Sequence, residues 1–465
     1  MSSIATANQQ GDRTERRRSG RVAALRRFVY GVVIARDDRT LAQRTAFIAF
    51  VIRAASAALG LVSQILLARW LGTYEYGVFA FAYVTLVLLG SLLPLGYSTA
   101  GQRFIAEYSE KGDEDHLRGF LHGSRILMFG IGTAVLAIGA AGLWLFGGYI
   151  DNHYVLPLYL VLVCLPAYAL MDIQDSIARN YSWIDLALAI PYLARPLSIL
   201  LIVGGAILVT GSASAVTASY ALIGATWATG VIQFLALEKR LRQKVPAGKR
   251  AYSWRLWTVT ALPIFLVESF YILLTNTDVL VLSIFEGPEE VGIYYAVVKT
   301  LALISFVPFA VTAASAHKYA EYGSNGDFEK LASFVRDTVR WTFWPAIGAA
   351  AVMLLAGKPL LWLFGPEFVA GYPLLFVLVL GLMARATVGP IDRVMNMLGQ
   401  QNFCAMIYAA AFALNLALNF TLIPMFGMAG AAWATSIALI VESILLFFAA
   451  RSRLGLHVFI LDRKR

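Results

Sequence analysis

The chain has 465 residues, of which 59% are hydrophobic and 14% are charged, with a mean hydropathy of +0.69 and a formal net charge of +10. A water-soluble domain of this length cannot bury so much apolar surface, so the composition excludes soluble enzymes and predicts an integral membrane protein.

The N-terminal segment is basic and has little periodic apolar content. Its first 44 residues hold ten arginines and four acidic residues. This pattern predicts a cytoplasmic tail over residues 1–41, which either attaches to anionic lipid or serves as an orientation signal. The first apolar segment is too long for a cleavable signal peptide and lacks a small-residue cleavage site.

Twelve apolar stretches follow, each close to the roughly 20 residues that a helix needs to cross hydrocarbon. They define an N-terminal lobe over 42–237, a basic linker over 238–255, a C-terminal lobe over 256–450 and a basic tail over 451–465. The expected spans are 42–70, 75–97, 119–147, 154–173, 185–209, 215–237, 256–285, 292–316, 337–363, 373–397, 404–425 and 429–450. The predicted fold class is therefore an all-α membrane protein with two six-helix lobes.

An internal repeat relates the two lobes. The segment AEYSEKGDEDHLRGF at 106–120 reappears as AEYGSNGDFEKLASF at 320–334, and Gly77 falls opposite Gly292 at almost the same offset. Since bilayer solubility alone does not select these polar residues, the repeat predicts two pseudo-symmetric halves.

Lysine and arginine are distributed unevenly between the loops. They gather in the two tails and in the loops after even-numbered spans, and none lies in a loop after an odd-numbered span. Because cytoplasmic loops retain positive charge, this asymmetry predicts a multi-pass protein with both termini cytoplasmic.

The sequence offers no pattern of catalytic, cofactor-binding or metal-binding residues. Its two cysteines, Cys164 and Cys404, lie inside expected spans, and its five histidines have no metal-ligand spacing. Walker, nucleophile-elbow and dinucleotide fingerprints are absent from the sequence. We therefore expect no enzyme activity, no cofactor and no metal.

Charged residues within the expected spans are the candidate functional residues, because each costs at least about 2.5 kcal/mol at a helix centre. Arg53 lies eleven residues into the first span, and the repeat offset carries it onto Glu268 in the seventh. These residues are predicted either to form a gate or substrate site between the lobes, or to pair within their own halves.

Other charges suit either an ion pair or a cationic cavity. Asp278 and Lys299 are level across the hairpin of the seventh and eighth spans, which favours a structural ion pair, although Lys299 is also a candidate substrate contact. Arg195 follows Pro191, which can open a kink toward the interior. Arg385 and Arg393 are eight residues apart, hence on similar helix faces.

Several acidic residues can neutralise these arginines. Asp392 adjoins Arg393, and Glu442 lies in the last span. If the arginines instead line a cavity, the ligand is anionic, because the guanidinium fork matches phosphate oxygens. A pyrophosphate head group on an amphiphile is the natural candidate.

The chain resembles the polysaccharide transporter branch of the multidrug/oligosaccharidyl-lipid/polysaccharide exporter superfamily, which includes Wzx-type O-antigen flippases. The resemblance covers residues 42–452 and is carried by RAASAALGLVSQILLARWLGTYEYGVFAFA at 53–82, RFIAEY at 103–108 and NFTLIPMFGMAGAAWAT at 419–435. The glycine and alanine run in the last segment suits tight helix packing.

The resemblance implies twelve helices around a central cavity and alternating access that carries an undecaprenyl-pyrophosphate-linked oligosaccharide across the inner membrane. It implies that Arg53 faces the cavity of a bacterial inner-membrane protein. Together with the charges found in the spans, we expect Arg53, Arg195 and Arg385 to be head-group contacts and Glu268 to be a partner or switch. Polymerase and chain-length proteins of the pathway are the expected protein partners. Glu268 departs from a purely cationic cavity.

Two alternatives stay open at this point. A cation-coupled multidrug antiporter on the same scaffold would need clustered acidic groups in the N-terminal lobe, whereas Glu75, Asp172 and Asp185 fall near span ends. A membrane glycosyltransferase or ligase of the polymer pathway would need a large external loop, and the longest expected outer loop has only about ten residues.

Overall fold

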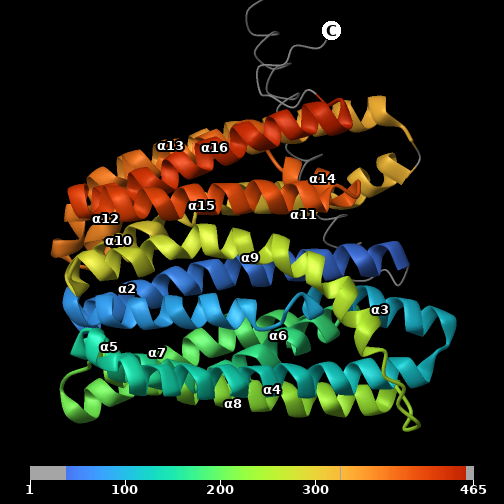
Figure 1. Cartoon of the computed structure of the whole chain (residues 1–465), viewed down its shortest axis with the longest axis horizontal. Coiled ribbons are helices and arrows are strands. Elements are labelled where there is room, and N and C mark those ends of the chain that lie inside the picture. The colour runs from blue at the N-terminus through green and yellow to red at the C-terminus, as the bar shows by residue number, and fades with distance from the viewer. Residues whose placement is uncertain (1–37, 325, 457–465) are drawn as a thin grey trace, which may run out of the picture. The chain divides into compact units, whose positions relative to one another are not determined.

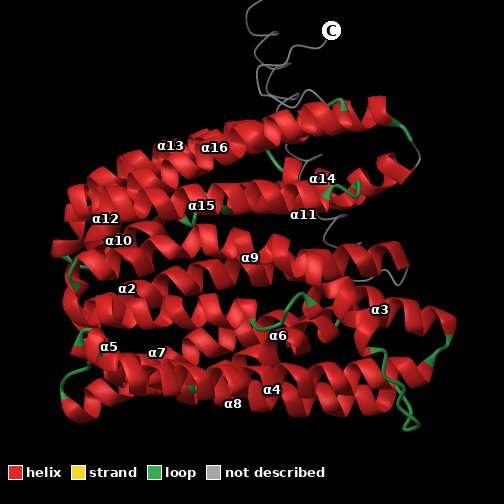
Figure 2. Cartoon of the chain, in the orientation of Figure 1, coloured by secondary structure: helices red, strands yellow, loops and turns green. Residues whose placement is uncertain are grey.

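A computed structural model of the chain describes residues 38–324 and 326–456 and contains helices but no strand in these ranges. Figure 2 shows helix over nearly the whole described chain. The N-terminal half forms α2 (Asp38–Leu92), α3 (Tyr97–Lys111), α4 (Glu114–Phe146), η1 (Gly147–Tyr149), α5 (Asn152–Leu162), α6 (Leu165–Asn180), η2 (Asp185–Ala194), α7 (Arg195–Thr210) and α8 (Ala215–Lys244).

The C-terminal half repeats this organisation. It forms α9 (Trp254–Phe285), α10 (Pro288–Leu301), α11 (Phe306–Ser324), α12 (Phe328–Phe364), η3 (Pro366–Gly371), α13 (Tyr372–Val388), α14 (Ile391–Met397), α15 (Gln401–Phe426) and α16 (Met428–Leu454). The tail predicted over 1–41 lies outside the described residues except for 38–41.

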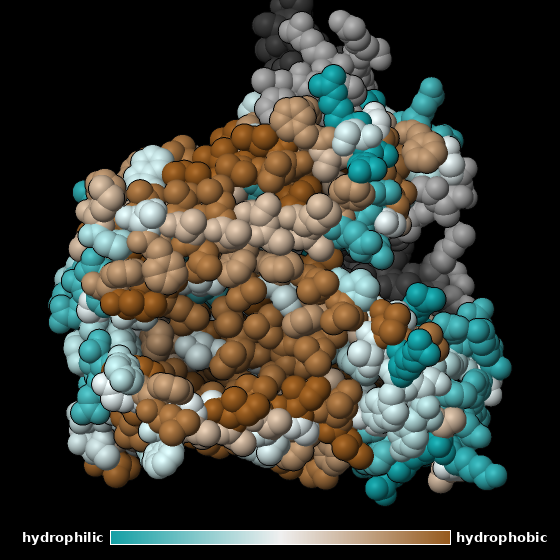
Figure 3. Space-filling model, in the orientation of Figure 1, coloured by the Kyte–Doolittle hydropathy of each residue, from teal (hydrophilic) through white to brown (hydrophobic). Residues whose placement is uncertain are grey.

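The chain divides into two compact units, residues 1–56 and 57–465. The described part of the first unit is the start of α2. Within the second unit, α4 to α8 lie below α9 and α12 to α16 lie above it in the view of Figure 1. The surface shown in Figure 3 is hydrophobic along the helices and hydrophilic around the turns at their right-hand end.

The repeat predicted from sequence is reproduced in backbone geometry. Gly112 and Gly326 have φ of 67° and 68°, and the following Asp113 and Asp327 have φ of −82° and −88°. The amide of Asp113 donates to the carbonyl of Tyr108 at 2.9 Å, and the amide of Asp327 donates to that of Tyr322 at 3.1 Å. A positive φ favours glycine, so each copy uses the same turn to begin its next long helix.

These two turns lie at the right-hand end of the helices in Figure 1, together with residues 245–253. We call this the repeat-turn end, and we call the other end, which carries Gly72 and residues 365–371, the far end. The repeat-turn end is the one that the charge distribution predicts to be cytoplasmic.

Nine described helices are long and apolar enough to cross a membrane, and the bent pair α5 and α6, which meet at 46°, makes ten. Every expected span coincides with a helix, but at two places the observed helices do not correspond one to one with the expected spans. The first two expected spans lie in α2, which is kinked at Gly72, where the φ of 75° is non-helical. The eighth expected span is divided between two shorter helices, α10 and α11. The all-helical membrane fold is confirmed, whereas the number twelve stays a prediction.

Close backbone packing explains the glycine and alanine run near the C-terminus. A Cβ on Gly430 would lie 2.2 Å from the carbonyl oxygen of Leu422, so α15 and α16 form a tight hairpin. Asn415 and Asn419 of α15 are buried, and Asn415 donates to Thr435 of α16 at 3.4 Å. The tight packing predicted for this segment is confirmed.

Two predicted boundaries differ from the structure. Helix α8 continues to Lys244, so the non-helical part of the predicted linker 238–255 is residues 245–253. The amide of Ala251 donates to the carbonyl of Asp115 at 2.9 Å, which ties this segment to the start of α4. The linker therefore holds a fixed position against the N-terminal half.

Candidate functional site in the seam between the halves

The two halves meet through backbone at the far end. A Cβ on Gly77 of α2 would lie 1.7 Å from the carbonyl oxygen of Pro288, and a Cβ on Gly292 of α10 would lie 2.7 Å from that of Thr73. Gly77 and Gly292 are the pair that the repeat offset aligns. Only glycine permits so close a crossing of two helices, so repeat-equivalent positions of the two halves touch directly.

Arg69 adds a second contact at the far end. Its guanidinium donates to the carbonyl oxygens of Trp362 and Leu363, both at 2.7 Å, and lies 4.8 Å from the Trp362 ring. These carbonyls end α12, where the helix dipole favours a cation. The far end of the seam is thus closed by backbone, charge and aromatic contacts.

At the repeat-turn end, the first half of α9 packs on the N-terminal half. Trp257 is fully buried, and its indole N–H donates to the hydroxyl of Tyr108 at 3.0 Å. The hydroxyls of Tyr97 and Thr258 lie 2.7 Å apart. Helix α9 therefore belongs to the C-terminal half by sequence but borders both halves.

A polar stripe runs along the exposed surface of α9. Glu268, Tyr271 and Thr275 are all exposed and follow the spacing of one helix face. A carboxylate is costly against lipid, so this face borders a polar space.

Helix α3 links this stripe to the N-terminal half. Thr99 donates to Glu268 at 2.8 Å, and the adjacent Ser98 donates to Asp172 of α6. Two carboxylates from different halves are therefore held by neighbouring hydroxyls.

Behind the stripe lies a buried charge cluster. The Arg385 guanidinium is 3.0 Å from a carboxylate oxygen of Glu442, which is 0% exposed, and 3.3 Å from Asp392. Tyr408 donates to Asp392 at 3.1 Å, and its ring contacts that of Tyr271 at 5.6 Å. The cluster thus connects the interior of the C-terminal half to the open face of α9.

The predicted common helix face of Arg385 and Arg393 is wrong. The helix breaks at Gly389, whose φ is 58°, so Arg385 lies on α13 and Arg393 on α14. Arg393 is 61% exposed and lies 3.8 Å from Asp392. Since Arg385 already faces two carboxylates, it can bind a phosphate only if one of them withdraws.

The remaining predicted residues lie elsewhere. Lys299 lies over the ring of Tyr295 at 4.7 Å, whereas Asp278 is buried and accepts hydrogen bonds from Tyr294 at 2.6 Å and Thr435 at 3.2 Å. Among the described residues no salt bridge joins Asp278 and Lys299, because each side chain has other partners, so the predicted structural ion pair is not formed.

Arg195 and Arg53 occupy two further settings. Arg195 follows the π-helical segment η2, which contains Pro191, and lies 4.9 Å from the Tyr168 ring. The backbone around Pro191 thus forms a wider helical turn, whereas the kink toward the interior stays a prediction. Arg53 belongs to the first unit, so its pairing with Glu268 stays a prediction.

Sequence reasoning missed an acidic group in the N-terminal half. It placed Asp172 near a span end, but α6 continues to Asn180 and carries Asp175 one turn later, 4% exposed. Asp175 accepts a hydrogen bond from the buried Gln233 at 2.9 Å and pairs with Arg179 at 3.2 Å. The spacing of Asp172, Asp175 and Arg179 on one helix face was the available signal.

Comparison with known proteins identifies the family. A family model described as "Polysaccharide biosynthesis protein" matches residues 42–316, more than half of the chain. The chain belongs to the polysaccharide biosynthesis protein family. A second model, "MatE", matches residues 263–421.

A curated relative of this polysaccharide biosynthesis protein is the "Probable low-salt glycan biosynthesis flippase Agl15" of Haloferax volcanii. It is 25% identical over 169 residues, which are 36% of this chain and 36% of that protein. The match thus spans about a third of the relative's length.

Solved structures share the fold of this family member. An inward-facing multidrug resistance MATE family transporter of the MOP superfamily has a TM-score of 0.73 at 14% identity, covering 88% of this chain and 98% of that one. The lipid II flippase MurJ in an inward closed conformation has 0.70 at 16% identity, covering 87% of each chain. The MOP-superfamily fold that the sequence resemblance implied is confirmed.

Proposed function

We propose that this protein moves lipid-linked saccharides between the leaflets of a membrane. The observation that carries the proposal is the family match over residues 42–316, and the flippase relative in Haloferax volcanii supports it. The seam suits this role, because it offers exposed polar groups, Glu268, Tyr271 and Thr99, within an otherwise apolar helical protein.

The finer form of the proposal names the substrate as an undecaprenyl-pyrophosphate-linked oligosaccharide repeat unit for exopolysaccharide, capsule or O-antigen assembly. The membrane is the bacterial inner membrane, with both termini cytoplasmic, and polymerase and chain-length proteins are partners. Arg53, Arg195, Arg385 and Lys299 are the proposed contacts for the pyrophosphate, because guanidinium and ammonium groups donate charge-assisted hydrogen bonds to phosphate oxygens.

Alternating access is the proposed mechanism. The glycine crossing and the Arg69 contact close the far end of the seam. A substrate head group would enter from the repeat-turn end and leave when the far-end contacts separate. This cycle requires the far end to close fully between turnovers.

The test of the function is mass spectrometry of lipid-linked saccharides, with secreted polymer measured in parallel, after deletion and restoration of the gene. We expect lipid-linked repeat units to accumulate and polymer to be lost on deletion, with both effects reversed on restoration. Unchanged saccharides and polymer would refute the proposal.

A second candidate, a cation-coupled multidrug antiporter, is favoured by one observation. The buried Asp175 and the half-buried Asp172, one turn earlier on α6, supply the acidic groups in the N-terminal half that this function needs. If deletion left saccharides unchanged but raised drug sensitivity, and if replacing both aspartates with asparagine reproduced that sensitivity, the antiporter would replace the flippase.

Charge exchange tests the proposed role of Arg53 and Glu268. We expect Arg53→Glu and Glu268→Arg each to lower polymer production, and the double exchange to restore part of it, because opposite charges at repeat-equivalent sites attract in either arrangement. The assay compares polymer at matched protein levels. Normal production in Arg53→Ala would show that the residue has no central role.

A further inference from the structure

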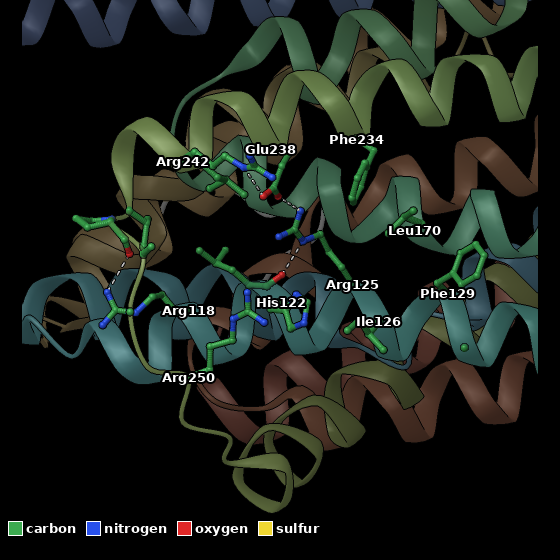
Figure 4. Close-up of a pocket in the computed structure, with 17 residues that line it drawn as sticks. Arg118, His122, Arg125, Ile126, Phe129, Leu170, Phe234, Glu238, Arg242 and Arg250 are labelled. Atoms are coloured by element: carbon green, nitrogen blue, oxygen red, sulfur yellow. Dashed lines mark hydrogen bonds and ion pairs between the residues drawn. The ribbon is translucent and has the colours of Figure 1, made fainter.

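A basic pocket lies outside the seam, within the N-terminal half. Its volume is about 930 Å³, and it lies between α4 and α8, with Leu170 of α6 on one side and residues 245–250 closing its repeat-turn end. Figure 4 shows these elements and the side chains between them. The volume falls in the range of sites for small organic ligands.

The lining changes from basic to apolar along the helices. Helix α4 presents Arg118, His122 and Arg125 and then Ile126 and Phe129. Arg118 and Phe129 are eleven residues apart, or about 16 Å along a helix. In Figure 4 the basic side chains lie toward the left and Phe129, Phe234 and Leu170 toward the right. The pocket is therefore amphipathic along its length.

Positive charge exceeds negative charge among the lining residues. Four arginines, Arg118, Arg125, Arg242 and Arg250, stand against one carboxylate, Glu238. Glu238 is shared, because it lies 2.8 Å from Arg125 and 3.1 Å from Arg242. One carboxylate cannot satisfy the donors of two guanidinium groups, so the pocket presents donors to a further anion.

The arginines have distinct roles. Arg118 is 14% exposed and is held by Glu114 at 2.8 Å, Asp115 at 2.6 Å and the carbonyl of Lys249 at 2.9 Å, so it builds the wall. Arg125 is 11% exposed and donates to the carbonyl of Leu121 at 2.8 Å.

Arg242 and Arg250 form the accessible part of the basic end. Arg242 is 78% exposed, and Arg250 is exposed with no carboxylate in ion-pair contact among the described residues. Arg250 can reorient onto a ligand, and Arg242 can do so by leaving Glu238, while Arg118 and Arg125 keep the wall in place.

A solvated basic surface does not account for this arrangement. Basic residues at a cytoplasmic membrane surface normally point into water, whereas two of these are largely buried and all line one cavity with an apolar end. A soluble anion would leave that apolar end empty. A phosphate joined to hydrocarbon fills both ends, because guanidinium groups match phosphate oxygens and aromatic side chains match acyl chains.

We propose that this pocket binds the anionic phosphate head group of a membrane amphiphile, with its hydrocarbon along Ile126, Phe129 and Phe234. Two sources share this chemistry: a resident anionic phospholipid and a lipid-linked pyrophosphate. The proposal concerns a site separate from the seam and does not rest on the proposed transport function.

The test uses the purified full-length protein and native mass spectrometry with phosphatidylglycerol, phosphatidylcholine, undecaprenyl pyrophosphate and inorganic pyrophosphate as separate probes. We expect phosphatidylglycerol to bind at least about tenfold more tightly than phosphatidylcholine, since charge-assisted hydrogen bonds are the stronger ones. Equal affinity for phosphatidylglycerol and phosphatidylcholine would overturn the proposal without any variant being made.

Paired variants locate the site. Arg242→Gln with Arg250→Gln removes two lining charges, and we expect phosphatidylglycerol affinity to fall about tenfold. The control variant, Lys239→Gln with Lys244→Gln, removes two exposed charges of α8 that do not line the pocket. We expect its affinity for phosphatidylglycerol to change less than about twofold. An equal loss of phosphatidylglycerol affinity in the two double variants would indicate a general attraction of the anionic lipid to the basic protein surface, and it would overturn the proposal.

Photolabelling and competition complete the test. Phosphatidylglycerol with a diazirine in its acyl chain should label peptides containing 126–130 and 231–241, and labelling confined to other helices would overturn the proposal. If undecaprenyl pyrophosphate displaces phosphatidylglycerol at a lower concentration than that of the phosphatidylglycerol, the ligand of the pocket is a lipid-linked pyrophosphate. If phosphatidylglycerol stays bound, the ligand is a resident phospholipid. Both outcomes support a lipid site in this pocket. If inorganic pyrophosphate bound as tightly as either lipid, the proposed binding of hydrocarbon at the apolar end would be refuted.

Discussion

Gly77→Ala is expected to reduce transport at least tenfold. The added methyl would lie 1.7 Å from the carbonyl oxygen of Pro288 and 3.0 Å from the amide nitrogen of Gly292. Backbone atoms cannot turn aside as a flexible side chain does, so α2 and α10 must separate. The far end then fails to close, and a carrier that cannot close one side cannot complete its cycle.

The measurement combines polymer production with a distance between spin labels at Val209 and Glu367, two exposed positions at the far end. We expect the label distance to increase in Gly77→Ala. Gly292→Ala should behave alike, because its methyl would lie 2.7 Å from the carbonyl oxygen of Thr73.

Gly142→Ala is the matched control. Gly142 also lies within a long helix, but a Cβ there meets nothing within 4 Å. We expect normal production and an unchanged label distance. If Gly77→Ala behaved like Gly142→Ala, the crossing would not be the closed gate.

Among the substitutions proposed for this protein, Arg385→Met is expected to lower its stability the most. It leaves Glu442, which is 0% exposed, and the largely buried Asp392 without their nearest cation. Breaking a buried ion pair by removing one partner costs about 3–5 kcal/mol. The thermal unfolding midpoint of the purified protein in detergent should therefore fall.

Arg385→Met combined with Glu442→Met should recover part of that loss, because the second substitution removes the buried Glu442 carboxylate, while Asp392 keeps only Arg393 at 3.8 Å. Arg393→Met is the control, since its guanidinium is 61% exposed and 3.8 Å from Asp392. An exposed ion pair contributes at most about 1 kcal/mol. Equal midpoints for Arg385→Met and Arg393→Met would contradict the buried cluster.

The candidate site was only partly predictable. The charged residues of the spans were identified, because charge within an apolar stretch is visible without a structure. The residues that pair with these charges were not identified from the sequence. The eight-residue spacing of Arg385 and Arg393 indicated one helix face, but the break at Gly389 rotates the second arginine away from the first.

The acidic pair of the N-terminal half was missed for a related reason. Hydropathy ended the fourth span at residue 173, whereas α6 continues to Asn180 because Asp175 is held by Gln233 of α8 and by Arg179. Local hydropathy treats a buried polar residue as a boundary, and only its tertiary partner shows otherwise.

The sequence by itself determined the membrane class, the two halves, the repeat turn at Gly112 and Gly326, and the alignment of Gly77 with Gly292. These features depend on hydropathy and on residue identity along the chain. The tertiary structure decided which of the charges are neutralised, which face of α9 is open and where the basic pocket lies. Those features depend on how helices are rotated and broken, and a single non-helical residue such as Gly72 or Gly389 changes that rotation with little effect on hydropathy.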